Sequence, residues 1–133
     1  MALPIKNGKV TTAFGKEGPM WKTGRHEGAD FAVPDGTPFF AMADGVVESV
    51  GTAWGKAYGD HRIVIHHPGF GYVVYAHGQS AKVKPGDKVK KGQELGKTGH
   101  SGNVTGPHLH VELQKGPGWT RGGGINPDKL FKV

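Results

Sequence analysis

The sequence predicts an all-β fold, in which antiparallel sheets form a single domain with long groove-forming loops and little or no helix. Apolar residues recur with period two in residues 62–66, 72–75 and 108–113, as in strands that bury one face. The 24 glycines and 9 prolines interrupt almost every window long enough for a helix. The intervals between candidate strands are too short for crossover helices, which favours antiparallel pairing.

The first three strands are expected at residues 29–33, 38–41 and 45–50. The segment 33–38 contains Pro-Asp-Gly and supplies a polar turn between the first two strands. The third strand follows Asp44-Gly45, which is a second turn signal. Single glycine and proline residues therefore mark turns between short strands here, and they do not form a disordered low-complexity segment.

Four further strands are expected at residues 61–66, 71–77, 94–98 and 108–114. Three of them carry the period-two pattern, and residues 94–98 follow a segment with turn signals at Pro85-Gly86 and Gly92. Four glycine-rich or tryptophan-bearing segments are expected to be loops that line a binding groove. They are residues 15–25, 51–60, 99–106 and 115–124.

The length of 133 residues fits one domain, which we assign to residues 1–133. There is no cysteine, so neither a disulfide framework nor a thiolate zinc site is possible, and any metal must be bound by nitrogen and oxygen. Residues 1–10 lack the basic and apolar regions of a secretory signal, and no segment approaches the ~20 apolar residues of a membrane span. We therefore expect a soluble monomer.

The net charge of +6 favours a polyanionic partner, and nucleic acid, acidic lipid and anionic wall polymers would all satisfy it. The lysine-rich segment 82–97 is interpreted as a solvated hairpin edge that lysines protect against edge pairing. No aromatic residues alternate with these lysines as a base-stacking platform requires, so a nucleic-acid partner is not expected. The same segment resembles half of a biotinyl or lipoyl carrier domain, but the modified-lysine motif of such carriers is missing.

His26 and Asp30 form an H-x-x-x-D pattern. On an ideal strand they would share a face but lie about 13 Å apart, too far to bind one ion. Gly28 lies between them and tolerates a bulge, so we expect the chain to bend there and bring an imidazole and a carboxylate together as zinc ligands. A helical zincin motif with Glu27 as the base is rejected, because the surrounding glycines would not sustain a helix.

Two further histidine patterns accompany this pair. His108 and His110 alternate on an expected strand and therefore face the same side, about 6.6 Å apart along the backbone. Tyr75 and His77 end another strand and are expected to share a face. The remaining histidines have no comparable pattern and are interpreted as strand, turn or loop residues: His61, His66, His67 and His100.

These motifs resemble those of the lysostaphin-type zinc endopeptidases of peptidoglycan. The resemblance rests on H-x-G-x-D at 26–30, Y-x-H at 75–77 and T-G-P-H-L-H-x-E at 105–112, and it extends over nearly the whole chain. It implies that one zinc ion is bound by His26, Asp30 and His110, and that a fourth position stays open for catalysis.

The resemblance also implies that His77 and His108 stand beside the water that zinc activates, although it does not say which of the two is the base. It implies a supporting role for Tyr75. Peptidoglycan is then the expected partner, with anionic wall polymers as a further one. A phage-encoded lytic enzyme and a domain of a longer exported protein are both open as origins.

Some relatives in this family lack ligands and act as wall-binding or hydrolase-activating modules. That alternative predicts dispensable His77 and His108, whereas an intact ligand and histidine set favours the enzyme. The peptide bond that is cut is left open, because groove shape depends on the loops. Trp21, Trp54 and Trp119 lie in these loops, and they fit groove lining and loop anchoring equally.

Overall fold

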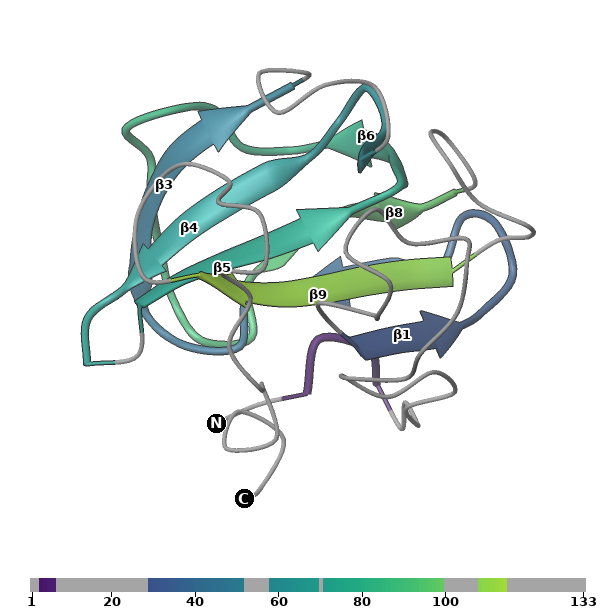
Figure 1. Ribbon diagram of the computed structural model, residues 1–133, viewed down its shortest axis with the longest axis horizontal. Coiled ribbons are helices and arrows are strands. Elements are labelled where there is room, and N and C mark those ends of the chain that lie inside the picture. Colours follow the sequence, from purple (N-terminus) through teal and green to yellow (C-terminus); the bar gives the residue numbers. More distant parts are fainter. Residues whose placement is uncertain (1–2, 7–28, 52–57, 70, 100–107, 115–133) are drawn as a thin grey trace.

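The computed structural model of the protein describes residues 3–6, 29–51, 58–69, 71–99 and 108–114 (Figure 1). The regular elements that lie wholly within these ranges are β-strands, and every strand pairing among them is antiparallel. The predicted all-β class is therefore confirmed. The assignment of residues 1–133 to one domain stays a prediction.

The larger sheet has six strands in the order β1-β9-β5-β4-β3-β7. The strands are β1 (Ala29–Ala32), β9 (His108–Gln114), β5 (Gly71–Ala76), β4 (Ile63–His67), β3 (Gly45–Val50) and β7 (Lys88–Val89). Figure 1 shows β9 between β1 and β5, so that the last described strand of the chain lies in the interior of the sheet. The first and last described strands are thereby paired.

The smaller sheet has three strands in the order β2-β8-β6. They are β2 (Pro38–Phe40), β8 (Glu94–Thr98) and β6 (Gly78–Ala81). Phe39 and Leu95 of this sheet join one buried cluster with Phe31, Tyr75 and Val111 of the larger sheet. The main core therefore lies between the two sheets, where apolar burial stabilises both.

All seven strands that the sequence predicts are present, with bounds that agree within two residues. Two short strands, β6 and β7, were not predicted. β7 has only two residues, too few for a period-two pattern, and β6 follows a sharp change of direction at His77. Most of the predicted loop residues lie outside the described ranges, which contain no helix long and apolar enough to cross a membrane.

The two faces of β9 have different surroundings. Leu109, Val111 and Leu113 belong to the main core. The alternate residues face the other side of the sheet. These are His108, His110, Glu112 and Gln114. A second apolar cluster of Val64, Val74 and Ala76, with Tyr58 and Tyr72 against it, covers the neighbouring part of that outer face.

A polar network inside the main core links β4 and β5. The Tyr75 hydroxyl accepts a hydrogen bond from the Met42 N–H at 3.1 Å and lies 3.0 Å from His67 Nε2. His67 Nδ1 lies 3.1 Å from the Asp44 carbonyl oxygen, which can only accept. Nδ1 therefore carries the proton, and Nε2 accepts from Tyr75. Burial lowers the pKa of His67, in agreement with a neutral imidazole.

Acid should destabilise the fold partly through His67. Its pKa in the folded chain lies below the ordinary 6.5. Between these two pKa values, His67 is protonated in the unfolded chain but stays neutral in the folded chain. The stability from neutral His67 is then complete above about pH 6.5 and is lost as the pH falls toward the lowered folded pKa. The free energy of unfolding of the metal-free wild type and of His67→Gln can be measured with urea between pH 5 and 7.5. As the pH falls, the free energy of unfolding of the wild type should decrease by up to about 1.4 kcal/mol per pH unit more than that of the variant. Parallel stability curves would contradict this assignment.

Candidate functional site

The pairing of β1 with β9 brings two of the predicted metal ligands together. Asp30 and His110 are register partners, and the Asp30 Oδ1 atom lies 2.8 Å from His110 Nδ1. His108 Nε2 lies 3.7 Å from the same carboxylate oxygen. All three side chains are on the outer face of the sheet, because register partners in an antiparallel pair share a face.

His77 joins this group through an unusual backbone conformation. It lies between β5 of the larger sheet and β6 of the smaller one, and its φ of 69° is the only positive value among the described residues other than glycine. Such a conformation costs about 1–3 kcal/mol, and it persists only where the surroundings impose it. The His77 ring centroid lies 4.9 Å from that of His108 and 5.9 Å from that of His110.

Tyr75 is not part of this group, and the expectation that it shares a face with His77 is wrong. Tyr75 is fully buried in the main core, where its ring stacks on Phe39 at a centroid distance of 6.1 Å and its hydroxyl bonds His67. The positive φ of His77 breaks the alternation that the sequence argument assumed. Tyr75 can therefore support the site only through the core beneath it.

His26, the third predicted metal ligand, lies outside the described residues, as does the bend expected at Gly28. Within the described part of the chain, no three neighbouring histidine or acidic side chains are arranged so that they could hold a metal ion by themselves. The described residues supply Asp30 and His110 as one pair of neighbouring ligand candidates, and His77 and His108 beside them.

Three residues of the site were given no role from the sequence: Tyr58, Glu112 and Gln114, although Glu112 ends the motif at 105–112. The His110 Nε2 atom lies 3.0 Å from Glu112 Oε1. Tyr58 donates its hydroxyl to Glu112 at 2.9 Å, and its ring lies 5.9 Å from that of His110. Glu112 had a usable signal, because it follows His110 with the period of two that a strand face requires.

The imidazole of His110 is held between two carboxylates. Burial lowers the pKa of His110, but hydrogen bonds to Asp30 and Glu112 outweigh burial and raise that pKa to about 10. A site with this electrostatic character favours a cation, either a proton or a metal ion. A metal-binding histidine commonly directs its second ring nitrogen to a carboxylate, as His110 does toward Glu112. The nitrogen and oxygen donors present here fit zinc.

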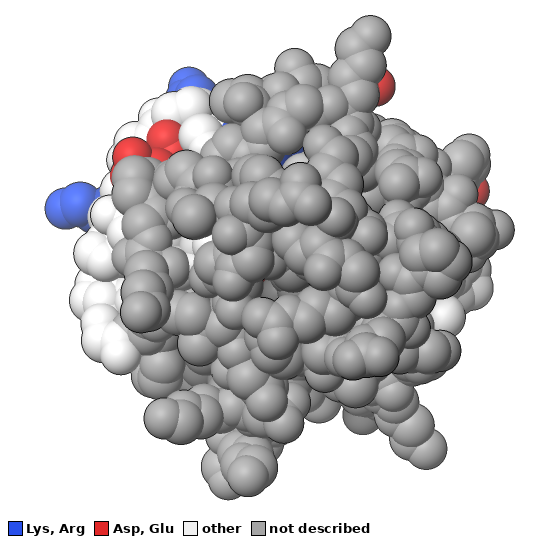
Figure 2. Space-filling model, viewed as in Figure 1, with Lys and Arg blue, Asp and Glu red and all other residues white. Residues whose placement is uncertain are grey.

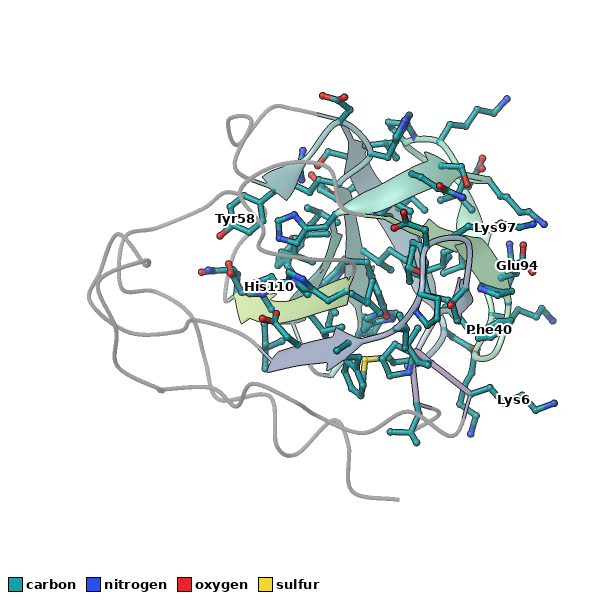
Figure 3. The ribbon with its side chains drawn as sticks, turned by 90° about the vertical axis from the view of Figure 1, so that its right-hand side faces the viewer. Lys6, Phe40, Tyr58, Glu94, Lys97 and His110 are labelled. Carbon is teal, nitrogen blue, oxygen red and sulfur yellow. The ribbon has the colours of Figure 1, made fainter. Side chains whose placement is uncertain are left out.

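The lysine-rich segment 82–97 lies away from this site. Figure 3 shows Lys97 and Glu94 on the opposite side of the molecule from His110 and Tyr58. Its lysines are exposed, and Lys82 forms an ion pair with Glu94. Figure 2 shows basic and acidic side chains near each other at the left edge of its view. The exposed and partly paired lysines agree with a solvated edge.

Comparison with known proteins shows which family the chain resembles. Residues 24–127 match the model of Peptidase family M23. The chain is 43% identical over 88 residues to the peptidoglycan DD-endopeptidase ShyA of Vibrio cholerae, which covers 66% of this chain and 20% of ShyA. The chain thus spans a fifth of the length of that relative.

Solved structures agree with the family match. The catalytic domain of the antimicrobial peptidase lysostaphin from Staphylococcus simulans superposes with a TM-score of 0.84 at 30% identity, over 96% of this chain and 94% of that one. A zinc-containing peptidase from Vibrio cholerae superposes with a TM-score of 0.75 at 31% identity, over 98% of this chain and 39% of that one. The fold is shared over nearly the whole of the lysostaphin domain.

The different positions of Tyr75 and the histidine group can be tested by removing one hydroxyl. Tyr75→Phe leaves the Met42 N–H and His67 Nε2 without their partner, so the free energy of unfolding should fall by about 1–3 kcal/mol. Zinc affinity, measured by chelator competition on the folded variant, should equal that of the wild type. A large loss of zinc affinity with unchanged stability would place Tyr75 at the site instead.

Proposed function

Because the chain belongs to peptidase family M23, we propose that it is a zinc-dependent endopeptidase that hydrolyses peptide bonds in bacterial peptidoglycan. The observation that carries the proposal is the contact of Asp30 with His110, with His77 and His108 next to it. Membership of the family supports the reaction class, and the peptidoglycan endopeptidases among the relatives support the substrate.

We assign His26, Asp30 and His110 as the ligands of one zinc ion per chain. Imidazole nitrogen and carboxylate oxygen are ordinary zinc ligands, and three protein ligands leave a position for catalysis. When bound, zinc supplies Lewis acidity, which acidifies a water molecule and polarises the scissile carbonyl. The Asp30 carboxylate faces Nδ1 of His110, so that nitrogen is the atom assigned to the metal.

His77 and His108 are assigned to proton transfer and charge stabilisation. Their rings meet edge to face, with centroids 4.9 Å apart, so both can reach one small reacting group. A neutral imidazole at this place accepts the proton that the attacking water loses. The other imidazole donates a hydrogen bond to the oxyanion that develops on the scissile carbonyl. The two histidines thereby share the work that a glutamate base performs in helical zincins.

The silent wall-binding module is not favoured by any described residue. Asp30, His77, His108 and His110 are all present and adjacent. The wall is the expected place of action, reached by phage release or as a domain of an exported protein. Anionic wall polymers are a second expected partner for the exposed lysines of residues 82–97, because the net charge is +6.

The proposed reaction predicts zinc-dependent release of peptides from purified peptidoglycan. The zinc-loaded chain should release fragments, a chelator should stop the release, and added zinc should restore it. Mass spectrometry of fragments from walls with different cross-bridges identifies the bond that is cut. Release that continues after complete removal of zinc, or a zinc-loaded chain that releases nothing from any wall, would contradict the proposal.

Two variants separate metal binding from turnover in this assay. Asp30→Asn weakens a ligand and should lose zinc together with activity. His108→Ala should keep zinc but lose about 10²- to 10⁴-fold in kcat, because a group that transfers a proton or stabilises charge is gone. Full activity of His108→Ala would instead indicate that this histidine has no part in the reaction.

A further inference from the structure

Glu112 is a buried carboxylate beside the proposed metal ligand. It lies two residues beyond His110 on the same face of β9, and only 1% of its surface is exposed. An ionised carboxylate is costly to bury unless hydrogen bonds replace its lost water. The hydrogen bonds of Glu112 therefore indicate its role.

Three donors surround the Glu112 carboxylate. Its Oε1 atom faces His110 Nε2 at 3.0 Å and the Tyr58 hydroxyl at 2.9 Å. Its Oε2 atom accepts from Gln114 Nε2 at 2.6 Å and lies 3.2 Å from the same tyrosine hydroxyl. Figure 3 shows the Tyr58 and His110 side chains next to each other at the site. Tyr58 and Gln114 thus hold the carboxylate in place while it faces the histidine.

The contact with Glu112 determines which nitrogen of His110 keeps its proton when a metal ion binds. Without a metal, both ring nitrogens face carboxylate oxygens, which can only accept: Nε2 faces Glu112 at 3.0 Å and Nδ1 faces Asp30 at 2.8 Å. A zinc ion bound by Asp30 and His110 would replace the Nδ1 proton, and Glu112 would then keep the remaining proton on Nε2. Without Glu112, the opposite tautomer would no longer be disfavoured, and the ring would lose the contact that fixes its rotation.

Tyr58 connects this arrangement to His77. Its backbone carbonyl accepts the His77 N–H at 3.0 Å, and the two rings stack at 6.5 Å with an interplanar angle of 11°. The hydroxyl of the same residue bonds Glu112. The Tyr58 side chain therefore contacts both Glu112 and His77.

We propose that Glu112 is a positioning residue, held by Tyr58 and Gln114, which fixes the tautomer and orientation of His110 for zinc. The inference rests on the proposed function and deepens it, because it assigns roles to residues that neither bind the ion nor touch the substrate. A purely structural Glu112 would change the stability of the fold without changing metal affinity.

Zinc affinity by chelator competition tests the proposal on the full chain. Glu112→Gln is nearly isosteric but turns one acceptor into a donor that faces Tyr58 or Gln114, and it should weaken zinc binding by about 10- to 100-fold. Tyr58→Phe removes one supporting hydrogen bond and should weaken it by about 2- to 10-fold. Glu94→Gln, on β8 of the other sheet, is the matched control and should leave zinc affinity unchanged.

The tautomer of His110 is a second measurement, and it should not change in a variant that has only lost stability. Nitrogen NMR of the zinc-loaded wild type should show His110 with a proton on Nε2 and none on Nδ1. In Glu112→Gln, the Nε2 proton should exchange with solvent faster. Circular dichroism establishes that each variant is folded, and if Glu112→Gln fails to fold, Tyr58→Phe decides by its own loss of zinc affinity.

The outcomes distinguish this inference from the function on which it rests. If the wild type binds zinc and folded Glu112→Gln or Tyr58→Phe binds it equally tightly, the positioning role is overturned while the proposed function stands. A proton on Nδ1 of His110 in the zinc-loaded wild type overturns it too. A wild type that binds no zinc overturns both.

Discussion

Asp30 and His110 are 80 residues apart in the chain, and one strand pairing places their side chains 2.8 Å apart. Among the described strands, β1 lies at the edge of the larger sheet and pairs only with β9, in a register that sets Asp30 opposite His110. A slip of one residue would turn the β1 side chains to the opposite face and direct Phe31 away from the core. The site therefore depends on the register of this single pair.

The core fixes that register through the other face of the same strand. Leu109, Val111 and Leu113 alternate with the site residues of β9 and are buried between the two sheets. Fully burying each such side chain is worth about 1.5–3 kcal/mol, so a slipped strand loses several of these contributions at once. The rigid apolar side of β9 thereby positions a polar side whose own hydrogen bonds would be too weak to select the register.

Much of the fold could be predicted from the sequence, because period two is a local signal. It identified β9 and placed His108 and His110 on one face, and the motifs indicated the family that residues 24–127 match. The conformation of His77 could not be predicted, because it results from the change of sheet between β5 and β6. The same change explains why His77 does not face the core as Tyr75 does. The contact of Tyr58 with Glu112 joins residues 54 apart, and no local pattern encodes it.

The location of the metal is the most direct test of this account. Crystals of the zinc-loaded chain, measured on both sides of the zinc absorption edge, would locate the ion by anomalous scattering. The account predicts one peak per chain, bonded to Asp30, to Nδ1 of His110 and to His26, with Glu112 on the far nitrogen of the His110 ring. A peak bonded to Glu112, or one remote from the β1–β9 pair, would contradict it.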